Sequence, residues 1–319
     1  MALQERAPRR TSLGPVIASG APDHRRRTLG LLLAVVSASC FGMMPVLTRV
    51  VYEDGADPVG VLAVRFALAA VVLLALARVR REVLPRGRPL LALCVLGGVG
   101  YVGMSLCFFL ALDRIPAGLC TLLLYFYPAV VVALGALLLG ERPRAAVVTC
   151  VVAATAGTAL TIGPVGGSGR LTGVLLALGA ALFYAGFILA GSRITGVGPL
   201  ATTAVVLSAG TVVLGALALV TQPQLPSRPS AWLALLGVAL IGTVVAVTAF
   251  FAALALLGAS DTAIVSTVEP VVSVGLAALV LGERLSPVQL LGGVAVLLAV
   301  GTLARLAPTA DEPAAAVPA

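Results

Sequence analysis

The sequence contains no lysine, one histidine and one tryptophan, and only 11% of its 319 residues are charged. Soluble domains carry about 25% charged and about 45–50% apolar residues. Here 60% of the residues are hydrophobic, and the mean hydropathy is +1.11. A folded chain with so few charges would expose far too much apolar surface to water. The composition therefore predicts an integral membrane protein, with the lipid bilayer as a partner.

The residue patterns that hold metals, nucleotides or nucleic acids are also missing. The five cysteines lie in apolar runs without a CxxC pair, and the only histidine, His24, lies in a polar N-terminal segment. No GxxxxGK[ST] motif is present. The net charge of +8 comes from arginines that separate apolar runs, so nucleic acid is not an expected partner. The sequence predicts no metal site, no disulfide framework and no cofactor.

Ten apolar runs, each close to the roughly 20 residues that cross a bilayer as a helix, follow one another with short connections. Because backbone polar groups in lipid must be satisfied within the segment, each run is predicted to be a helix. The predicted fold class is an all-α integral membrane protein with ten transmembrane helices. The predicted spans are 28–48, 58–77, 89–111, 117–139, 145–162, 171–190, 199–220, 231–256, 262–281 and 287–306.

Both ends of the chain are predicted to be cytoplasmic tails. Residues 1–27 are polar, basic and proline-rich, which predicts a disordered extension. A cleavable signal peptide would place its apolar segment earlier, so the first span is expected to act as an uncleaved signal anchor. Residues 307–319 form the second predicted tail.

The arginines predict the orientation. With the N-terminus inside, fifteen of the 21 basic residues fall in cytoplasmic segments, and the positive-inside rule then places both termini in the cytoplasm. Arginine in place of lysine, with abundant alanine, glycine and valine, points to a GC-rich bacterial genome and thus to the bacterial cytoplasmic (inner) membrane. The fifteen are Arg6, Arg9, Arg10, Arg25, Arg26, Arg27, Arg78, Arg80, Arg81, Arg86, Arg88, Arg142, Arg144, Arg193 and Arg305.

The chain also repeats itself. Pro128–Arg142 (PAVVVALGALLLGER) and Pro270–Arg284 (PVVSVGLAALVLGER) are identical at ten of fifteen positions, and Gly42–Arg49 loosely parallels Gly186–Arg193. Residues 28–162 and 171–306 are therefore predicted to be two copies of a five-span unit. A unit with an odd number of spans enters the membrane the second time upside down, which makes an inverted repeat of the kind used by secondary transporters.

A span with an internal proline that runs to LGER in both halves, preceded in the first by Val64-Arg65-Phe66, resembles the EamA repeat of the drug/metabolite transporter (DMT) superfamily. The resemblance covers about residues 29–306. It implies ten helices in two inverted five-helix repeats, with a central cavity lined by spans 1–4 and 6–9 and with spans 5 and 10 at the periphery. It also implies transport of amino acids, metabolites, nucleotide sugars or drugs. The two halves differ before the proline, where the first has Tyr127 and the second has Glu269.

Polar residues inside the spans are the candidates for the substrate cavity, because charges in the bilayer core usually face a cavity or a partner. Thr262, Ser266, Glu269 and Ser273 share one face of span 9 by helical spacing. Arg65 lies in span 2 at a similar depth. We expect Arg65 and Glu269 either to form an ion pair, which would be static or functional, or to share a cavity where Arg65 meets an anionic substrate group. Glu269 is also a candidate proton carrier. Burial and a nearby arginine shift the pKa of a carboxyl group in opposite directions, so the sequence alone does not fix its protonation state.

Aromatic residues are further candidates. Thr121, Tyr125 and Pro128 share a face of span 4, and Tyr125, Tyr127 and Tyr184 are expected to contribute to an aromatic cavity. Tyr101 and Trp232 are interpreted instead as interfacial anchors.

The prolines and the glycine-glutamate-arginine motifs have two interpretations each. Pro128 and Pro270 lack the backbone N–H that a helix uses, so each kinks its helix and frees a carbonyl group. The kink is interpreted either as a hinge for transport or as a feature of helix packing alone. The motifs at residues 140–142 and 282–284 are expected to end their spans, with Glu and Arg facing headgroups or pairing with one another. A direct role in substrate handling is the less favoured interpretation.

These observations favour a secondary transporter that exports a small organic solute such as an amino acid, a purine-like compound or a drug-like compound. A membrane-embedded enzyme is the alternative, but away from their ends the spans hold one Glu, one Arg and no His, too few groups for a catalytic centre. A structural membrane protein or a channel is a third possibility, which the inverted repeat disfavours. The chain is not predicted to be an enzyme, and its oligomeric state is left open.

Overall fold

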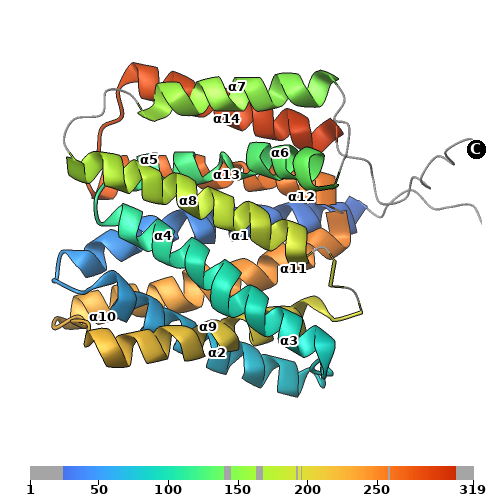
Figure 1. The fold of residues 1–319 in the computed structure, drawn as a ribbon, viewed down its shortest axis with the longest axis vertical. Coiled ribbons are helices and arrows are strands. Elements are labelled where there is room, and N and C mark those ends of the chain that lie inside the picture. The colour runs from blue at the N-terminus through green and yellow to red at the C-terminus, as the bar shows by residue number, and fades with distance from the viewer. Residues whose placement is uncertain are drawn as a thin grey trace, which may run out of the picture.

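A computed structural model describes residues 24–139, 145–162, 168–191, 193–194, 196–257 and 259–306. Within these ranges the chain forms only helices and connecting turns (Figure 1). The first half contains α1 (His24–Tyr52), α2 (Pro58–Val79), α3 (Arg88–Val95), the π-helical turn η1 (Leu96–Tyr101), α4 (Val102–Leu112), α5 (Ala117–Leu124), α6 (Tyr127–Leu139) and α7 (Ala145–Ile162). The second half contains α8 (Ser168–Gly191), α9 (Pro199–Thr221), α10 (Pro229–Ala239), the π-helical turn η2 (Leu240–Val245), α11 (Ala246–Leu257), α12 (Ala259–Ser266), α13 (Val268–Val280) and α14 (Pro287–Leu306).

Six of these helical stretches are long and apolar enough to cross a membrane, and four further apolar helices are shorter. The long stretches are Arg25–Tyr52, Pro58–Val79, Arg88–Leu112, Gly169–Gly191, Pro199–Thr221 and Pro229–Leu257. The shorter ones are Ala117–Val131, Ala145–Thr161, Ile264–Val280 and Pro287–Thr302. Proline is the first residue of α2, α9 and α10 and the second of α3, and at these positions the N–H that it lacks would have no partner within the helix.

The start of the first helix corrects one sequence boundary. The polar tail was predicted to reach Arg27, but α1 already begins at His24. The arginines at 25–27 therefore extend the helix beyond its apolar part, which long side chains allow at a membrane surface. Residues 1–23 and 307–319, and the first glycine-glutamate-arginine motif at 140–142, lie outside the described residues.

The third helix of each half, predicted as one continuous span, contains a π-helical turn. η1 separates α3 from α4, and η2 separates α10 from α11. A π-helical turn holds an extra residue, so backbone carbonyls there lose their usual partners. In η2, the hydroxyl of Thr243 donates to the carbonyl of Val238 at 3.0 Å.

The fourth helix of each half is broken at the predicted proline. α5 ends at Leu124 just before Pro128, and α12 ends at Ser266 just before Pro270. Proline cannot donate to the carbonyl four residues earlier, which leaves the carbonyls of Leu124 and Ser266 without that bond. The predicted interruption of both spans is therefore present.

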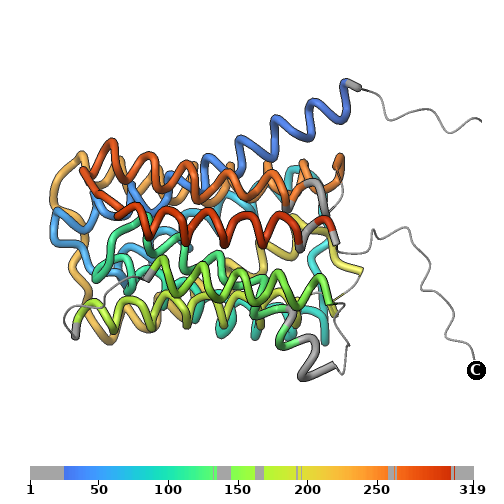
Figure 2. Tube along the Cα trace, turned by 90° about the horizontal axis from the view of Figure 1, so that it is seen from above, coloured from blue at the N-terminus to red at the C-terminus, as the bar shows by residue number. Residues whose placement is uncertain are grey.

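The helices run side by side along one direction, and the described chain ends, His24 and Leu306, lie at the same end of the bundle (Figure 2). We call this the terminal end and the other the opposite end. α7 and α14 pack against each other at one edge of the bundle (Figure 1). Their contact is close, because a Cβ on Gly157 would lie 2.8 Å from the carbonyl oxygen of Gly292. This edge position matches the peripheral place expected for spans 5 and 10.

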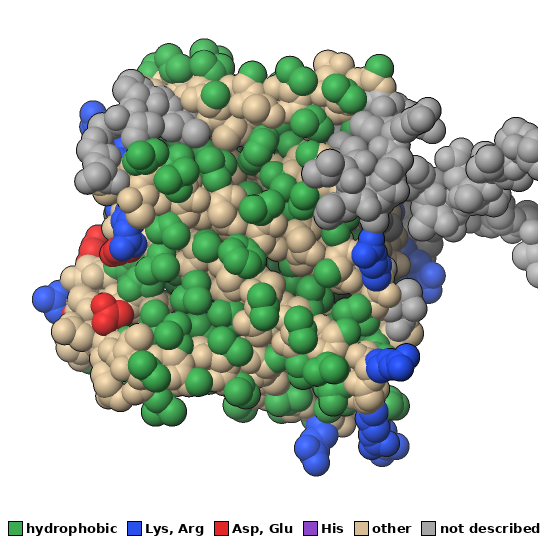
Figure 3. Space-filling model, in the orientation of Figure 1, with side chains coloured by type: hydrophobic (Ala, Val, Ile, Leu, Met, Phe, Trp, Pro, Cys, Tyr) green, Lys and Arg blue, Asp and Glu red, His purple; other side chains and the backbone are tan. Residues whose placement is uncertain are grey.

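The distribution of side chains is that of a membrane protein. Apolar side chains cover the face drawn in Figure 3, while charged side chains gather at its two ends. The largest core cluster includes Phe66, Phe109, Leu119 and Leu214. Apolar residues thus both fill the interior and form the lipid-facing surface.

Candidate functional site

Among the residues that the structure describes, Arg65 is the most deeply buried charged residue. It lies on α2 with 2% of its surface exposed. Its Nε donates to the hydroxyl oxygen of Thr243 at 2.9 Å, and its guanidinium lies 3.5 Å from the hydroxyl of Tyr101. No carboxylate forms an ion pair with it in the described part of the chain. All its hydrogen-bond partners there are neutral.

Two aromatic rings complete the surroundings of this guanidinium. Its central carbon lies 5.5 Å from the ring centre of Phe66 and 5.2 Å from that of Phe109. Ring faces attract a cation, but weakly compared with a carboxylate. A buried charge without an opposite charge is costly, so Arg65 forms a site that would gain from an anionic ligand group.

The two hydrogen-bond partners of Arg65 are related by the internal repeat. Tyr101 ends η1 and Thr243 lies within η2, 142 residues apart, as are Pro128 and Pro270. Arg65 therefore joins the π-helical turns of the two halves. The interpretation of Tyr101 as an interfacial anchor was wrong, because its hydroxyl lies at the buried Arg65 in the middle of its helical stretch. Trp232, by contrast, lies in the first turn of α10, at the opposite end.

Glu269 lies at the start of α13 with a tyrosine as its partner. The Tyr125 hydroxyl donates to the carboxylate at 2.9 Å and to the backbone carbonyl of Ser266 at 2.7 Å. This carbonyl is the one that Pro270 frees, so the predicted consequence of the proline is used directly by the site. The predicted ion pair between Arg65 and Glu269 is not formed, since each binds a different partner.

A row of aromatic rings connects the two charged residues. From Arg65 it passes through Tyr101, whose ring centre lies 5.5 Å from that of Phe187. Phe187 stacks on Tyr184 at 6.3 Å, and Tyr184 meets Tyr127 edge-on at 4.6 Å. Tyr127 contacts Tyr125, the partner of Glu269, at 6.2 Å. Tyr125, Tyr127 and Tyr184 thus lie together in the structure, as the aromatic-cavity hypothesis requires.

The remaining polar candidates form hydrogen bonds within the protein. Thr121 on α5 is buried and lies 2.9 Å from the hydroxyl of Ser273 on α13, and it also bonds the carbonyl of Ala117. The Ser266 hydroxyl bonds the carbonyl of Thr262. The predicted polar face of span 9 therefore has two kinds of contact. Glu269 bonds a tyrosine of the aromatic row, while Ser273 connects α13 to Thr121 on α5.

At the opposite end, an acidic loop of the first half forms hydrogen bonds with residues 224–228 of the second half. Both Asp54 oxygens accept hydrogen bonds from Ser227, and Oδ2 also accepts one from the amide of Arg228. The Nε of Arg228 lies 3.3 Å from Oδ1. These hydrogen bonds, first that of the Arg228 amide, hold the pKa of Asp54 below its ordinary value. The amide of Asp57 donates to the carbonyl of Gln224, and the amide of Gln224 donates to the Asp57 carboxylate.

Glu283 makes a second connection at the same end. Its carboxylate accepts the amides of Ala117 and Gly118 at 2.9 and 3.2 Å, which caps the start of α5. It also lies 3.9 Å from Arg49. The expectation that this glutamate faces headgroups or pairs with its neighbour is corrected, because it bonds the first half while Arg284 is exposed. We call the Asp54 and Glu283 contacts the two latches.

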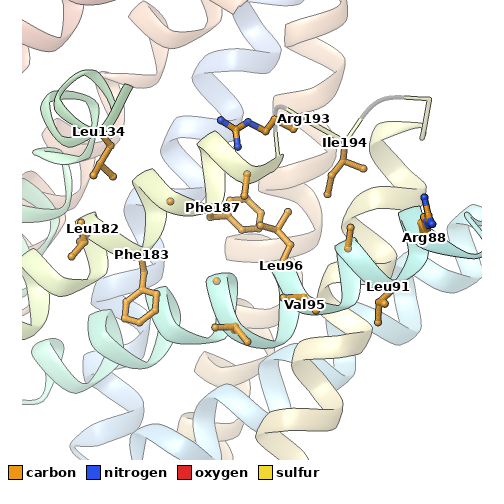
Figure 4. A pocket seen from close by; sticks show the side chains of 15 residues that line it. Arg88, Leu91, Val95, Leu96, Leu134, Leu182, Phe183, Phe187, Arg193 and Ile194 are labelled. Carbon is orange, nitrogen blue, oxygen red and sulfur yellow. The ribbon is translucent and has the colours of Figure 1, made fainter. Parts of the chain in front are cut away.

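A groove of about 870 Å³ lies between α3, η1 and α8 and reaches Leu134 of α6 (Figure 4). Phe187 belongs both to its wall and to the aromatic row. Arg88 and Arg193 line it together with apolar side chains.

Thr243, Phe187 and the latch residues were not anticipated. Thr243 and Phe187 lie on spans without a charge or motif beside them, and only the fold brings them to Arg65 and Tyr184. One signal was available, since Thr243 occupies the repeat position of Tyr101.

The fold and the site together define a class. In the residues that the structure describes, six membrane-length apolar helices, four shorter ones and a buried arginine among aromatic rings form a multi-pass membrane protein. Residues 28–163 and 171–305 each match the EamA-like transporter family. The chain belongs to this family, and the two matches coincide with the two repeats.

A solved structure described as the crystal structure of a protein has the same fold. It superposes with a TM-score of 0.64 at 21% sequence identity, covering 88% of this chain and 97% of that chain. No curated protein matches the chain.

Proposed function

We propose that the protein is a secondary transporter that exports a small organic metabolite across the bacterial inner membrane. Ten spans, as two inverted five-helix repeats, would come from the six long stretches plus α5–α6, α7, α12–α13 and α14. The arginines at the terminal end favour a cytoplasmic location for both termini. The amino acids, purine-like and drug-like solutes considered above remain the candidate cargo.

The observation that carries the proposal is the buried Arg65 with its neutral partners, linked by aromatic rings to Glu269. A solute with an acidic group would supply the opposite charge that Arg65 lacks. A planar or apolar body would stack on Tyr101, Phe187 and Tyr184. We therefore favour an anionic, amphipathic solute over a cationic one.

Alternating access is supported by the unequal ends of the molecule. Both latches lie at the opposite end, where each connects one half to the other. Such contacts between repeats keep one side closed. In the transport cycle they would break when the other side closes, and Arg65, which bonds residues of both halves, would be exposed alternately.

A proton at Glu269 is the coupling ion that we propose. Tyr125 has one hydroxyl proton but two acceptors, and the carbonyl of Ser266 can only accept. If Glu269 carries a proton, it donates to the tyrosine oxygen and both contacts are satisfied. The neighbouring Tyr127 and Tyr184 bring no charge at neutral pH.

Flux into and out of proteoliposomes tests the transport function. Wild-type protein should show saturable flux of one solute from a panel of amino acids, purines, sugars and drugs. Arg65→Leu should reduce the apparent affinity roughly 100-fold, the size expected for leaving a buried charge pair incomplete, while Arg65→Lys should lose less. Conversion of a solute without flux would instead support an enzyme.

Carbodiimide labelling tests the proton site without a known substrate. Dicyclohexylcarbodiimide modifies protonated carboxyl groups in apolar surroundings, and Glu269 is the only acid inside a predicted span. Wild-type protein should be labelled at Glu269 near neutral pH, and less as pH rises; Glu269→Gln should not be labelled there. An unlabelled Glu269 at pH 6, or flux that ignores an imposed pH gradient, would contradict the coupling.

A further inference from the structure

The groove between α3 and α8 opens toward the bilayer rather than into the bundle. Three of its wall residues, Leu91, Val95 and Val99, are 66%, 56% and 62% exposed. The apolar face seen in Figure 3 is the one that α4 and α8 cover in Figure 1. A hollow of this size is large enough for a drug-sized or lipid-chain ligand.

Two arginines lie where the groove meets the terminal end. Arg88 begins α3, and Arg193 follows the end of α8. In Figure 4 the two arginines lie at separate places on the rim of the groove, Arg88 above Leu91 and Arg193 on the other side of Ile194. Neither arginine forms an ion pair within the ranges that the structure describes.

Each of these arginines has a counterpart in the other repeat, and both counterparts have acidic partners. Arg49 corresponds to Arg193 in the repeated segment Gly42–Arg49, and it meets Glu283. Arg228 precedes Pro229 at the start of α10, just as Arg88 precedes Pro89 at the start of α3. Arg228 forms an ion pair with Asp54. An acidic partner thus accompanies these positions at the opposite end, whereas at the groove an acidic group can come from outside the chain.

We propose that the groove is a binding site for an anionic phospholipid of the leaflet at the terminal end. Its anionic headgroup would meet the arginines at the rim, Arg88 and Arg193, since a guanidinium forms two parallel hydrogen bonds with phosphate oxygens. An acyl chain would follow Leu91, Val95 and Phe183. Basic pockets between membrane helices on the cytoplasmic side bind such headgroups, and the lateral opening favours a lipid over a soluble anion.

Gly186 provides a way to fill the groove without changing its charge. It lines the groove on α8, and a Cβ built on it meets no atom within 4 Å. A leucine there would occupy the space of the acyl chain without displacing the protein. Gly215 on α9 also has open space at its Cβ but lies outside the groove, so Gly215→Leu is the matched control.

The experiment measures retention of phosphatidylglycerol against phosphatidylcholine by native mass spectrometry of the full chain in mixed nanodiscs. Wild type should retain phosphatidylglycerol preferentially. The double variant Arg88→Gln/Arg193→Gln should lose roughly tenfold to thirtyfold of that preference, as expected when two headgroup contacts are removed. Gly186→Leu should also lose it, while Gly215→Leu and the double variant Arg78→Gln/Arg80→Gln, which removes charges of the same leaflet outside the groove, should keep it.

The proposal is overturned if the Arg88/Arg193 variant retains the lipid like wild type, or if the Arg78/Arg80 variant loses as much. Retention by Gly186→Leu would exclude an acyl chain in the groove. Size-exclusion chromatography confirms that each variant is folded. Because the assay needs no flux, a failure here leaves the proposed transport function untouched.

Discussion

Gly42 on α1 and Gly186 on α8 occupy corresponding places in the two repeats, yet only one of them is packed against a neighbour. A Cβ on Gly42 would lie 2.7 Å from the carbonyl oxygen of Glu269, whereas a Cβ on Gly186 would meet nothing within 4 Å. The arginines that follow them differ in the same way, since Arg49 meets Glu283 and Arg193 has no ion pair in the described part. Two copies of one unit therefore create one tight interface and one open groove, as expected for one state of an inverted repeat.

The largest effect is expected from closing the tight interface further. Gly42→Leu would force side-chain atoms into the backbone of α13, and such overpacking destabilises by about 1–3 kcal/mol or more. The melting temperature in detergent should fall strongly, together with the yield of folded protein. Gly186→Leu is the matched change in the other half and should melt close to wild type; equal losses in both would refute the difference between the halves.

A smaller effect is expected at the Glu283 latch. Glu283→Gln removes the charge-assisted hydrogen bonds to α5 and the ion pair with Arg49. Together these contacts contribute at most about 1.5–3 kcal/mol to stability, because partial exposure to solvent weakens them. The opposite end should then open more often. A variant that keeps Cys120 as its only cysteine reports this, since Cys120 is buried on α5 behind the latch, and maleimide labelling should become faster. Arg284→Gln changes an exposed neighbour and should leave the labelling rate unchanged.

Thr121→Val tests whether this candidate packs helices or lines the cavity. The substitution keeps the shape but removes the bond to Ser273, so the free energy of unfolding should fall by about 1 kcal/mol. Flux should remain unchanged apart from the lower stability. A change in solute affinity at normal stability would show that Thr121 belongs to the cavity after all.

The smallest effect is expected at Asp54. Its pKa is lowered in the folded protein. Its contribution to stability is therefore present above the pKa that it has in the unfolded chain, and is lost as pH falls through its pKa in the folded protein. Hydrogen exchange at the amides of Ser227 and Arg228, corrected for intrinsic rates, should therefore stay slow at pH 7 and 5. Protection should disappear only below the ordinary value of 3.8. Asp54→Asn should show the weaker protection at all these pH values, and an unprotected wild type at pH 5 would contradict the latch.

Much of the fold follows from the sequence because a bilayer leaves the backbone few choices. Apolar runs, the repeated LGER segments and the two prolines predicted helices, halves and helix breaks. The π-helical turns were not predictable in this way, because Leu96–Tyr101 and Leu240–Val245 have no residue that requires the extra backbone unit.

The site was only half accessible from the sequence. Arg65 and Glu269 stand out because charges are rare in spans, but their partners depend on how distant helices meet. Nothing in the residue types indicated that Arg65 would bond Thr243, 178 positions away, or that Tyr125 would be the partner of Glu269. The ion pair was the simplest arrangement of two opposite charges, and the aromatic row replaces it.

The single tryptophan gives the opposite end a built-in optical probe. Trp232 lies in the first turn of α10, and its amide donates to the carbonyl of Arg228, the residue that Asp54 holds. Its indole is half-buried against the core, so loosening of that end would change the polarity around it. Because the chain has no other tryptophan, the fluorescence of unlabelled protein would follow the closing and opening of this end in real time.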